Sequence, residues 1–411
     1  MLASLDYSPS AYPIVHITGT SGKGSTAASI AAILTAAGYR VGLRTSPYLQ
    51  VASEKLQVGS LLVDGSALDR ISALVTNAHN SLLTRDGSVQ RLGHAEAWIV
   101  LSLVWFAERN VDAAIIEVGA GGRFDSTNIV QPTVSVITSV GVDHVATLGP
   151  TIADIAWHKA GIIKPGATVI VGDTPAEAWK VILDEAAAAD VRIVRPSSTQ
   201  VSPPKMLRMP GAFQQQNAAV AIATIEALGQ HGFTIPKSAI EAGLSEVRLP
   251  GRLERMPHLG SPIVWIDGAH NADKIAALTG EIELIAGDGP LPVVVVGMLG
   301  AKDTRSIVSK LAPISSTIIA TQPSVIGRTS LSAEVLAAQV QASAFTGTVL
   351  LEPDPHAALH RAESLAKAQG ASVLVTGSMY LAGQVRRRWY PDAEIVLQRT
   401  PWPIIGAERP L

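Results

Sequence analysis

The stretch G-T-S-G-K-G-S-T at residues 19–26 decides how the first part of the chain folds. It follows the apolar run 14–17, which predicts a short buried strand, and precedes the Ala-rich run 27–37, which predicts a helix ending at Gly38. In a glycine loop between a strand and a helix, the backbone N–H groups point into one concavity, and the helix dipole adds positive potential there. The stretch therefore predicts a phosphate-binding site.

Side chains of this loop favour a nucleotide as the ligand. Lys23 would place a mobile positive charge near the β- and γ-phosphates, and Ser25 or Thr26 would supply a hydroxyl for Mg²⁺. Gly24 separates the lysine from the hydroxyls, an order that is typical of ligases which activate a carboxylate with ATP. The alternative is an ordinary glycine turn before a helix, but the order of strand, loop, lysine, hydroxyl and helix favours the phosphate site.

Composition limits the classes of protein to which the chain can belong. Its 411 residues favour two or three domains, and 47% hydrophobic against 16% charged residues indicates a large buried core. The formal net charge of −2 gives no electrostatic reason to expect nucleic acid or an anionic membrane as a partner. The sequence contains no cysteine, which excludes disulfides, thiolate metal sites and thiol nucleophiles.

Neither a secretory leader nor a membrane span is visible in the sequence. The N-terminus lacks a basic segment followed by a long apolar one. The most apolar run near the middle, residues 97–107, is too short to cross a bilayer. We therefore expect a soluble, cytoplasmic protein.

Short β-branched runs alternate with longer Ala- and Leu-rich helical patterns along almost the whole chain. This rhythm predicts βαβ units, that is, parallel sheets covered on both faces. We expect an α/β protein with an N-terminal P-loop-type, parallel-sheet ATP-binding domain over residues 1–248 and a smaller C-terminal Rossmann-like domain over 249–411, divided at the Leu249-Pro250-Gly251 turn. The predicted strands are 14–17, 41–43, 111–118, 133–140, 168–171 and 191–194, then 263–266, 293–296, 317–320, 349–351 and 373–375. The predicted helices include 27–37, 95–109, 174–189, 214–244 with breaks at Gly232 and Pro236, and 381–389.

Four predicted strands of the first domain end in polar residues. Besides the glycine loop, these ends are the segments R-T-S-P at 44–47, E-V-G-A-G-G-R at 117–123 and G-V-D-H at 141–144. In open α/β sheets, ligands bind outside the carboxyl ends of the strands. Oxygen ligands and one imidazole suit Mg²⁺ that is held jointly with ATP phosphates. The residues predicted to form this set are Ser25, Ser46, Glu117 and His144.

Each of these candidates also has a structural interpretation. A carboxylate in an apolar strand, such as Glu117, is costly unless it is paired or bound to metal, and it could instead cap a helix or pair with Arg123. His144 could be a core histidine. Lys159, in the apolar run A-W-H-K-A-G-I, is not placed like a surface lysine, although its ammonium could still reach solvent.

The run W-I-D-G-A-H-N at 265–271 ends a strand and begins a helix in the second domain. Asp267 and His270 would lie at the carboxyl edge of that sheet, where they could face the first domain, although His270 could be a mere helix N-terminal residue. Arg252 could reach phosphate oxygens with two guanidinium nitrogens or be a surface residue. The basic run 386–388 would be a favourable charge at the solvated end of the last helix, or would attract an anionic acceptor.

Taken together, these motifs resemble the folylpolyglutamate synthase/dihydrofolate synthase family, a branch of the Mur-ligase superfamily. They occur in the family's order from about residue 14 to residue 388. The matching pieces are H-I-T-G-T-S-G-K-G-S-T, L-R-T-S-P-Y-L, I-E-V-G-A-G-G-R-F-D-S-T-N, I-T-S-V-G-V-D-H, H-K-A-G-I-I-K-P-G, Q-Q-Q-N at 214–217, P-G-R-L-E, D-G-A-H-N and V-T-G-S-M-Y.

The resemblance implies an ATP-dependent, ADP-forming ligase that adds L-glutamate to a folate or pteroate carboxylate. It further implies two Mg²⁺ ions, small-molecule substrates, a monomer, and neither nucleic acid nor membrane as a partner. The residues implied in ATP binding are Gly19, Thr20, Ser21, Gly22, Lys23, Gly24, Ser25, Thr26, Asn217 (at the adenine), Arg252 (at the phosphates) and Asp267. The implied metal ligands are Ser25, Ser46 and Glu117 for one ion and His144 for the second, with Lys159 as a further ligand if it is carbamylated. The implied catalytic residues are Lys23, Lys159, Asp267 and His270.

The chain departs from the family's pattern at three places. Ser21 stands where the family usually has Asn, and Tyr48 where it usually has His. The family normally carries helices before the glycine-loop strand, which here begins near residue 13. We therefore expect folylpolyglutamate synthase activity ahead of dihydrofolate synthase activity. Two alternatives stay open: a superfamily ligase acting on a different carboxylic acid, and a non-catalytic nucleotide-binding paralogue.

Overall fold

The computed structural model describes residues 1–5, 7, 11–196, 207–257, 262–300, 303–325 and 327–405. The chain forms two compact units whose main division falls between Arg248 and Leu249. The first unit comprises Met1–Tyr48, Ala52–Arg208 and Phe213–Arg248, and the second Leu49–Val51, Met209–Ala212 and Leu249–Leu411. The predicted division into 1–248 and 249–411 did not assign the two short segments to the second unit.

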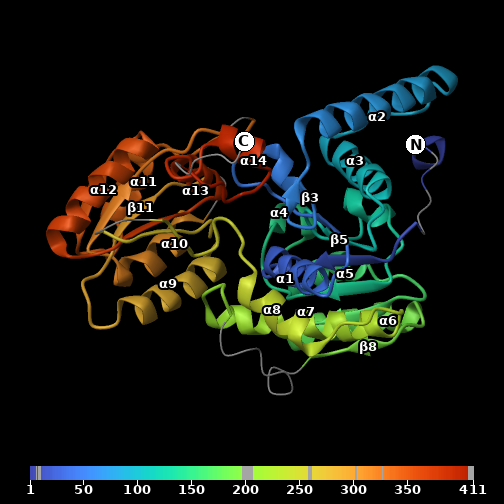
Figure 1. The fold of residues 1–411 in the computed structure, drawn as a ribbon. Coiled ribbons are helices and arrows are strands. Elements are labelled where there is room, and N and C mark those ends of the chain that lie inside the picture. Colours follow the sequence, from blue (N-terminus) through green and yellow to red (C-terminus); the bar gives the residue numbers. More distant parts are fainter. Residues whose placement is uncertain are drawn as a thin grey trace. The chain divides into compact units, whose positions relative to one another are not determined.

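The first unit is built on an eight-stranded sheet of order β4-β3-β2-β5-β1-β6-β7-β8 (Figure 1). The strands from β2 to β8 in this order run parallel, and the short edge strands β3 and β4 are antiparallel. The strand bounds are β1 Ile14–Thr18, β2 Val41–Arg44, β3 Leu56–Val58, β4 Leu61–Leu62, β5 Ala113–Glu117, β6 Val134–Ile137, β7 Thr168–Val171 and β8 Ile193–Val194.

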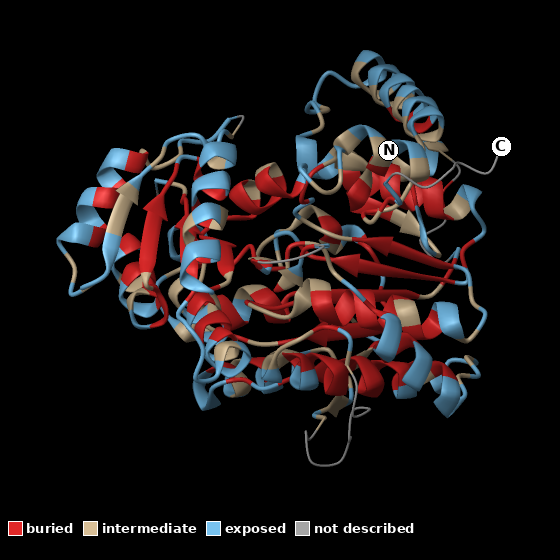
Figure 2. Ribbon diagram, turned by 60° about the vertical axis from the view of Figure 1, so that its left-hand side comes forward, coloured by how far each residue is buried: buried red, intermediate tan, exposed pale blue. Residues whose placement is uncertain are grey.

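Helices cover both faces of this sheet. Successive strand residues point to opposite faces: Val15 and Ile17 pack in a core with α1, α7 and α8, whereas Ile14 packs in another with α2 and α3. A third core joins β6 and β7 to α4, α5 and α6. Both faces of the central strands are consequently buried (Figure 2). The helix bounds are α1 Lys23–Ala36, α2 Gly65–Arg85, α3 His94–Glu108, α4 Val145–Leu148, α5 Ile152–Ala160, α6 Ala176–Ala188, α7 Ala212–Gly229 and α8 Lys237–Glu246.

The second unit has a six-stranded sheet of order β13-β12-β11-β14-β10-β9, in which only β9 is antiparallel. Val293 and Val295 of β11 pack with α12 and α13, while Val294 and Val296 pack with α9, α10 and α11 on the other face. The strand bounds are β9 Glu254–Arg255, β10 Val264–Ile266, β11 Val293–Val296, β12 Thr317–Ala320, β13 Thr348–Leu351 and β14 Val373–Thr376. The helix bounds are α9 Ala272–Ala286, α10 Thr304–Leu311, α11 Ala333–Gln341, α12 Pro355–Gln369, α13 Met379–Arg386 and α14 Asp392–Gln398.

The α/β architecture expected from the sequence is confirmed, but several element ends differ. The helix expected at 27–37 begins four residues earlier, at Lys23, because Gly22 takes the left-handed N-cap conformation (φ 83°). The last expected helix, 381–389, is α13, which begins at Met379 because Ser378 caps it by accepting from the Leu381 amide (3.0 Å). The sequence did not lead us to expect α2, α14 or the antiparallel strands β3, β4 and β9.

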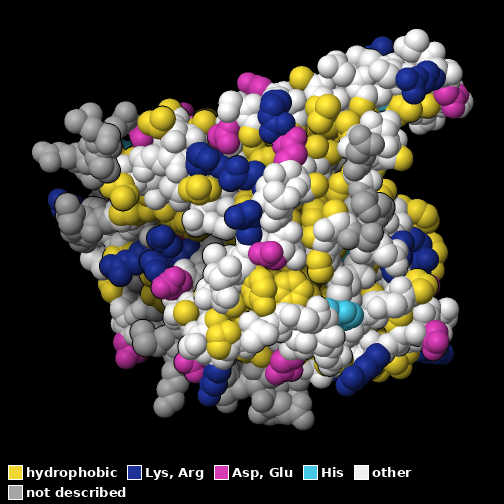
Figure 3. Space-filling view, turned by 45° about the vertical axis from the view of Figure 1, so that its right-hand side comes forward, with side chains coloured by type: hydrophobic (Ala, Val, Ile, Leu, Met, Phe, Trp, Pro, Cys, Tyr) yellow, Lys and Arg dark blue, Asp and Glu magenta, His cyan; other side chains and the backbone are white. Residues whose placement is uncertain are grey.

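The helices described in the structure include none that is both long and apolar enough to cross a membrane. On the face of the molecule shown in Figure 3, basic and acidic side chains are interspersed. This pattern matches the near-balanced charge of the sequence, with 32 basic and 34 acidic residues.

Candidate active site

The four strands with polar ends lie side by side in the first sheet, in the order β2-β5-β1-β6. They run parallel, so their carboxyl ends meet at one edge. This edge carries the glycine loop after β1, residues 44–47 at the end of β2, Glu117 at the end of β5 and residues 141–144 beyond β6. Since ligands of parallel sheets bind outside this edge, these segments form the candidate active site.

The segment that follows β6 holds the glycine loop. The Thr20 hydroxyl donates to the Gly141 carbonyl and accepts from the Gly141 amide, both at 3.0 Å. The Ser21 amide donates to Ser139 Oγ (3.0 Å), and the Ser21 carbonyl accepts from Thr138 Oγ1 (2.6 Å). The loop's backbone is therefore already ordered, which lowers the entropic cost of binding a ligand.

Two glycines of the loop occupy positions where a side chain would not fit. A Cβ would lie 1.9 Å from Thr138 Oγ1 at Gly19, and 2.2 Å from Asn217 Oδ1 at Gly22. Asn217 is only 8% exposed, and its Nδ2 donates to Gln214 Oε1 at 2.9 Å. The structure thus places Asn217 directly against the glycine loop, and its contact with adenine stays a prediction.

The first turn of α1 directly follows the loop. No side chain caps the start of this helix, whose N-cap is Gly22. An uncapped helix N-terminus favours anions, because its amides and its dipole point toward them. Lys23 Nζ donates to the Gly19 carbonyl at 2.8 Å, so the ammonium lies over the loop. Ser25 and Thr26 follow in the same turn and are buried.

Glu117 ends β5 and is buried, with 5% of its surface exposed. Its Oε2 accepts from the Ser46 amide at 2.9 Å, and its carbonyl accepts from an Arg44 guanidinium nitrogen at 2.8 Å. Arg123, the alternative partner expected for Glu117, forms an ion pair with Glu185 at 2.7 Å. Two of the predicted metal ligands, Glu117 and Ser46, are therefore adjacent in the structure.

Asp125 organises the turn after Glu117, a role that the sequence motif alone did not reveal. Its Oδ2 accepts from the Ala120 amide (3.0 Å), and its Oδ1 accepts from the amide (3.0 Å) and the hydroxyl (2.6 Å) of Thr127. Thr127 Oγ1 also lies 2.9 Å from Nε2 of His16, a fully buried residue of β1. Burial lowers the pKa of His16 to about 3, so its ring is neutral. The pattern D-S-T, in which an Asp can accept from the backbone two residues on, is the signal that could have pointed to this turn.

Lys159 lies in α5, which packs against the turn that follows Glu117. Asn128 Nδ2 donates to the Gly161 carbonyl at 3.1 Å, and a Cβ at Gly161 would lie 2.3 Å from Arg123 Cβ. Lys159 itself is only 3% exposed, so the alternative in which its ammonium reaches solvent is wrong. Its carbamylation stays a prediction.

His144 is the N-cap of α4 and has a left-handed backbone with φ 53°. Its side chain is 50% exposed and its Nε2 lies 4.0 Å from Asp143 Oδ2. The alternative of a core histidine is therefore wrong. An exposed imidazole beside a carboxylate at this edge can take a ligand, and the role of His144 toward a second metal ion stays a prediction.

The edge offers oxygen atoms suited to Mg²⁺. Within the part of the chain that the structure describes, no group of three or more His, Asp or Glu side chains could hold a metal by itself. The donors present are the Glu117 carboxylate and the hydroxyls of α1, and Thr26 Oγ1 is buried without a hydrogen-bond partner among the described residues. Mg²⁺ in nucleotide sites takes one or two carboxylates and completes its shell with phosphates and water, so this donor set fits such an ion.

In the second unit, Asp267 follows β10 and is 7% exposed. Its two oxygens accept from the amides of Leu253 and Ala269, each at 2.7 Å. Burial raises the pKa of Asp267 and outweighs the opposing effects of Arg252 and of the two amide bonds. Asp267 thus fixes the turn of the D-G-A-H-N motif.

His270 and Arg252 lie around the same turn of the second unit. His270 Nδ1 is 2.8 Å from the Gly268 carbonyl, and its Nε2 is 3.3 Å from Lys274 Nζ. An Arg252 guanidinium nitrogen contacts Met379 Sδ at 2.9 Å. The structure therefore brings together Asp267, His270 and Arg252, and their roles in the reaction stay predictions.

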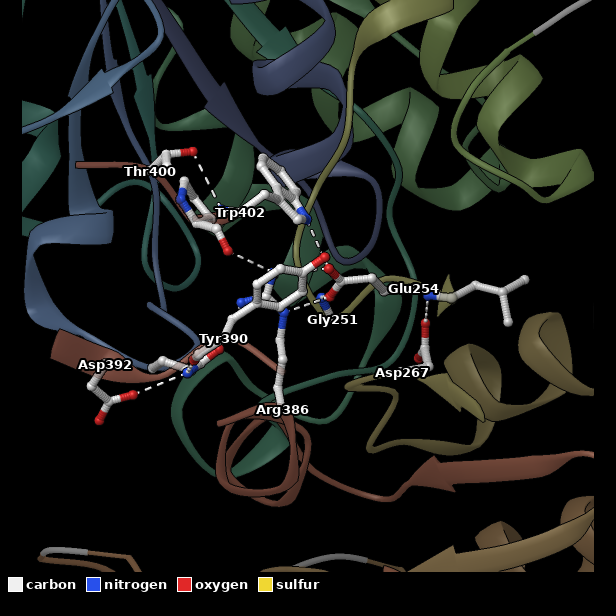
Figure 4. A network of polar contacts seen from close by, with 11 residues as sticks. Gly251, Glu254, Asp267, Arg386, Tyr390, Asp392, Thr400 and Trp402 are labelled. Carbon is white, nitrogen blue, oxygen red and sulfur yellow. Dashed lines mark hydrogen bonds and ion pairs between the residues drawn. The ribbon is translucent and has the colours of Figure 1, made fainter. Parts of the chain in front are cut away.

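Arg386, the first residue of the basic run 386–388, packs inside the second unit (Figure 4). Arg386 is fully buried, and its Nε and one terminal nitrogen donate to the two Glu254 oxygens at 2.8 Å each. Its other terminal nitrogen donates to Gln50 Oε1 at 2.6 Å, and Trp402 Nε1 donates to Glu254 at 2.8 Å. The expectation of a solvated helix end is therefore wrong for Arg386. Arg387 and Arg388 form ion pairs with Asp392 and Glu363.

Known proteins resemble this chain in both sequence and structure. The family model of the Mur ligase, glutamate ligase domain matches residues 251–379. The chain is 33% identical over 408 residues to the folylpolyglutamate synthase of Lacticaseibacillus casei, which covers 91% of this chain and 89% of that protein. It is 32% identical over 412 residues to the dihydrofolate synthase/folylpolyglutamate synthase of Bacillus subtilis, covering 94% and 93%.

Solved structures agree with this similarity. The Mycobacterium tuberculosis folylpolyglutamate synthase complexed with ADP and AMPPCP superposes with a TM-score of 0.85 at 28% identity, over 95% of this chain and 96% of that one. The Escherichia coli FolC protein in complex with DHPP and ADP superposes with a TM-score of 0.80 at 29% identity, over 94% and 90%. The chain therefore belongs to the folylpolyglutamate synthase/dihydrofolate synthase family of Mur ligases, which are ATP-dependent, ADP-forming ligases.

Proposed function

We propose that this protein activates the carboxylate of a folate with ATP and joins it to L-glutamate, as a folylpolyglutamate synthase. The observation that carries the proposal is the ordered glycine loop with the uncapped first turn of α1, set at the same sheet edge as the adjacent pair of Glu117 and Ser46. The names of the relatives from Lacticaseibacillus casei and Bacillus subtilis support the choice of substrate.

The reaction proceeds in two steps. A carboxylate oxygen of the acceptor attacks the γ-phosphorus of ATP, the bond to the bridging oxygen breaks, and ADP leaves. The glutamate amine then attacks the carbonyl carbon of the acyl phosphate, phosphate leaves, and the amine loses a proton. In this mechanism the loop amides and Lys23 hold and neutralise the phosphates, so that catalysis is mainly positioning and electrostatic stabilisation.

The metal sites belong to the proposal. Ser25, Ser46 and Glu117 would hold one Mg²⁺ and His144 a second, with a carbamylated Lys159 as an anionic ligand. When bound, these ions would offset the negative charge of the phosphates. The buried Glu117 carboxylate, already oriented by the Ser46 amide, supports this assignment.

Further parts of the proposal concern residues beyond the glycine loop. Asn217 would contact the adenine, Arg252 would bind phosphate oxygens, and Asp267 and His270 would act on the nucleotide or the transfer step. We also propose a cytoplasmic monomer that acts only on small molecules.

The decisive experiment measures acceptor-dependent ADP release with glutamate and a panel of acids. We expect release with tetrahydrofolate, and the rate with dihydropteroate decides whether dihydrofolate synthase activity is also present. Release only with an unrelated carboxylic acid would contradict folate as the substrate. Binding of ATP in isothermal titration, without ADP release for any acid, would instead show a non-catalytic paralogue.

Glu117→Gln tests the metal assignment, because it removes the charge and keeps the shape. We expect the Mg²⁺ concentration for half-maximal activity to rise about tenfold or more. Glu226→Gln, on the exposed side of α7, is the matched control and should leave the Mg²⁺ profile unchanged. A Glu117 variant with the parent profile would show that this carboxylate is purely structural.

A further inference from the structure

The loop between β2 and β3 starts at the candidate active site and enters the second unit. Ser46, a predicted metal ligand, donates its amide to Glu117 Oε2 at 2.9 Å in the first unit. Leu49–Val51, in the middle of the loop, belongs to the second unit, and the chain then returns to the first. At the base of the loop the Thr45 amide donates to the Lys55 carbonyl at 3.2 Å. The loop is therefore part of both units within a few residues of Ser46.

Leu49 is embedded in the second unit. It is buried and shares a core with residues of α12 and α13. A Cβ at Gly383 of α13 would lie 2.1 Å from the Leu49 carbonyl oxygen, so the helix comes against the loop at a position that requires glycine. A Cβ at Gly251 would lie 3.0 Å from Leu49 Cδ1. Leu49 is therefore held by its backbone as well as by its side chain.

The side chain of Gln50 is held by hydrogen bonds. Gln50 is only 6% exposed, and its Oε1 accepts from a terminal nitrogen of Arg386 at 2.6 Å. Its Nε2 donates to the Tyr390 carbonyl at 2.8 Å and to Asp392 Oδ1 at 3.0 Å. A side-chain amide has two N–H donors, and both are used here. The oxygen and the nitrogen of the amide thus each fix Gln50 in the second unit.

Arg386 is fixed in turn by partners of its own (Figure 4). Its Nε and one terminal nitrogen form a fork with the two Glu254 oxygens, and that terminal nitrogen also donates to the Pro401 carbonyl at 2.8 Å. The guanidinium carbon lies 4.3 Å from the centre of the Tyr390 ring. A buried guanidinium in a bidentate pair has little freedom to rotate. Arg386 therefore presents a donor to Gln50 in a fixed position.

The tether between Gln50 and Ser46 is short and stiff. Only residues 47–49 separate the two, so their α-carbons can be at most roughly 14 Å apart. Pro47 fixes its own φ and restricts the backbone of Ser46. A displacement of Gln50 is therefore transmitted to Ser46.

We propose that Gln50 and Arg386 are positioning residues for the predicted metal ligand Ser46. This inference rests on the proposed function, in which Ser46 and Glu117 hold one Mg²⁺. The loop is anchored at one end by the Ser46 amide on Glu117 and at the other by the Gln50 side chain on Arg386. When the second anchor is weakened, the Ser46 hydroxyl samples more positions and the site binds its ion less tightly, as for other groups that orient a metal ligand.

Gln50→Met tests the anchor, because it removes the hydrogen bonds and keeps an unbranched side chain of similar length. In the ligand-free chain we expect faster hydrogen exchange of the amides within residues 44–48, measured by mass spectrometry. We also expect the gain in AMPPCP affinity from Mg²⁺ to fall about tenfold, measured by isothermal titration with Mg²⁺ and with EDTA. Ser315→Ala is the matched control. It removes another buried hydrogen bond of the second unit, to the Leu311 carbonyl at 2.6 Å, and should change neither quantity.

Asp392 offers a milder test if Gln50→Met does not fold. Its side chain is 38% exposed, and its carboxylate binds both Gln50 and Arg387. Asp392→Ala removes the acceptor of Gln50 and should reduce the gain from Mg²⁺ about two- to fivefold. Arg387→Ala breaks the same ion pair but leaves the contact with Gln50, so it should not change the gain. Asp392→Asn keeps an acceptor for Gln50 and should behave as the parent does.

The outcomes separate this inference from the proposed function. An unchanged gain from Mg²⁺ in Gln50→Met, equal losses in Asp392→Ala and Arg387→Ala, or unchanged exchange of residues 44–48 would each overturn the positioning role. In these cases a loss in Glu117→Gln would still support the metal site. If Glu117→Gln also kept the parent's gain from Mg²⁺, the metal assignment would fail and this inference with it. Folate-dependent ADP release by the parent chain tests the proposed substrate independently of these variants.

Discussion

The glycine loop of the first unit and the D-G-A-H-N turn of the second occupy the same position in their sheets. Each follows a parallel strand at its carboxyl end and leads into a helix, β1 into α1 and β10 into α9. The two helix starts differ in chemistry. The N-cap of α1 is Gly22 and carries no side-chain cap, whereas Asn271 caps α9 by accepting from the Lys274 amide at 2.9 Å.

The two turns differ in how their backbone amides are satisfied. In the second unit, a side chain of the turn accepts the hydrogen bonds of nearby backbone amides: the buried Asp267 accepts from the amides of Leu253 and Ala269. In the first unit no side chain of the loop accepts from the first turn of α1, and Lys23 adds positive charge instead. Substitutions in the glycine loop should therefore cost activity, and those in the D-G-A-H-N turn should cost stability first.

The largest effect is expected for Lys23→Ala. Loss of one preorganised positive group at the phosphates should lower kcat about 10²–10³-fold, while the free energy of unfolding changes by no more than about 0.5 kcal/mol, as for a surface substitution. Steady-state kinetics and urea unfolding measure the two quantities. Lys237→Ala is the control. Near-parent turnover in Lys23→Ala would break the comparison, because the loop would then have no phosphate role.

The reverse pattern is expected for Asp267→Ala. Two buried amides lose their acceptor, which should reduce the free energy of unfolding by about 2–3 kcal/mol. Urea unfolding followed by the signal of the second unit measures this loss. Nucleotide binding at the first unit, measured by isothermal titration with AMPPCP, then tells whether Asp267 also contacts the nucleotide. A fully stable Asp267→Ala variant would show that the carboxylate does not hold the turn.

A smaller contrast compares two glycines with positive φ. Gly22→Ala places a Cβ 2.2 Å from Asn217 Oδ1, whereas Gly370, which is also left-handed with φ 64° at the end of α12, has nothing within 4 Å of its Cβ position. Both variants should lose about 1 kcal/mol of stability from backbone strain. Only Gly22→Ala should also weaken AMPPCP binding, because the loop must shift to relieve the contact. Equal AMPPCP affinity in the two variants would contradict the close fit of Asn217.

A further effect is expected in the acid stability of the parent chain. The pKa of His16 is lowered from 6.5 to about 3, so the folded state binds fewer protons than the unfolded state between these values. This contribution to stability is complete above pH 6.5 and is lost as the pH falls, by about 1.4 kcal/mol per pH unit. Urea unfolding at pH 7, 6 and 5 measures how steeply the free energy of unfolding changes with pH. His16→Gln should reduce this slope by the contribution of one proton, about 1.4 kcal/mol per pH unit. An unchanged slope would place a different group in this role.

The sequence indicated the segments of the candidate active site because the residues of each segment are neighbours in the chain. The glycine spacing, Lys23 and the hydroxyls of residues 25 and 26 stand within eight residues, and each polar strand end directly follows an apolar run. Strand positions followed for the same reason: the expected strand 111–118 contains β5, Ala113–Glu117. The expected strand is longer than β5 at both ends, because the apolar residues Val111 and Val118 lie just outside β5.

Other parts of the site could not be read from the sequence. Asp125, Thr127 and His16 act together, yet His16 Nε2 and Thr127 Oγ1 belong to residues 111 positions apart. Arg386 was expected in solvent because it stands in a basic run, but Glu254 and Gln50, far away in the chain, bury it. Nothing in a one-dimensional pattern specifies such partners.

Local sequence patterns were enough to predict the α/β class, a candidate phosphate loop and polar strand ends, because helix and strand periodicity and glycine conformations depend on neighbouring residues. The strand order β2-β5-β1-β6, the contact of Asn217 with Gly22 and the burial of Lys55 beside Trp98 could be seen only in the folded chain. These depend on which distant segments pack together, and that choice is made by the burial of the whole sheet rather than by any single segment.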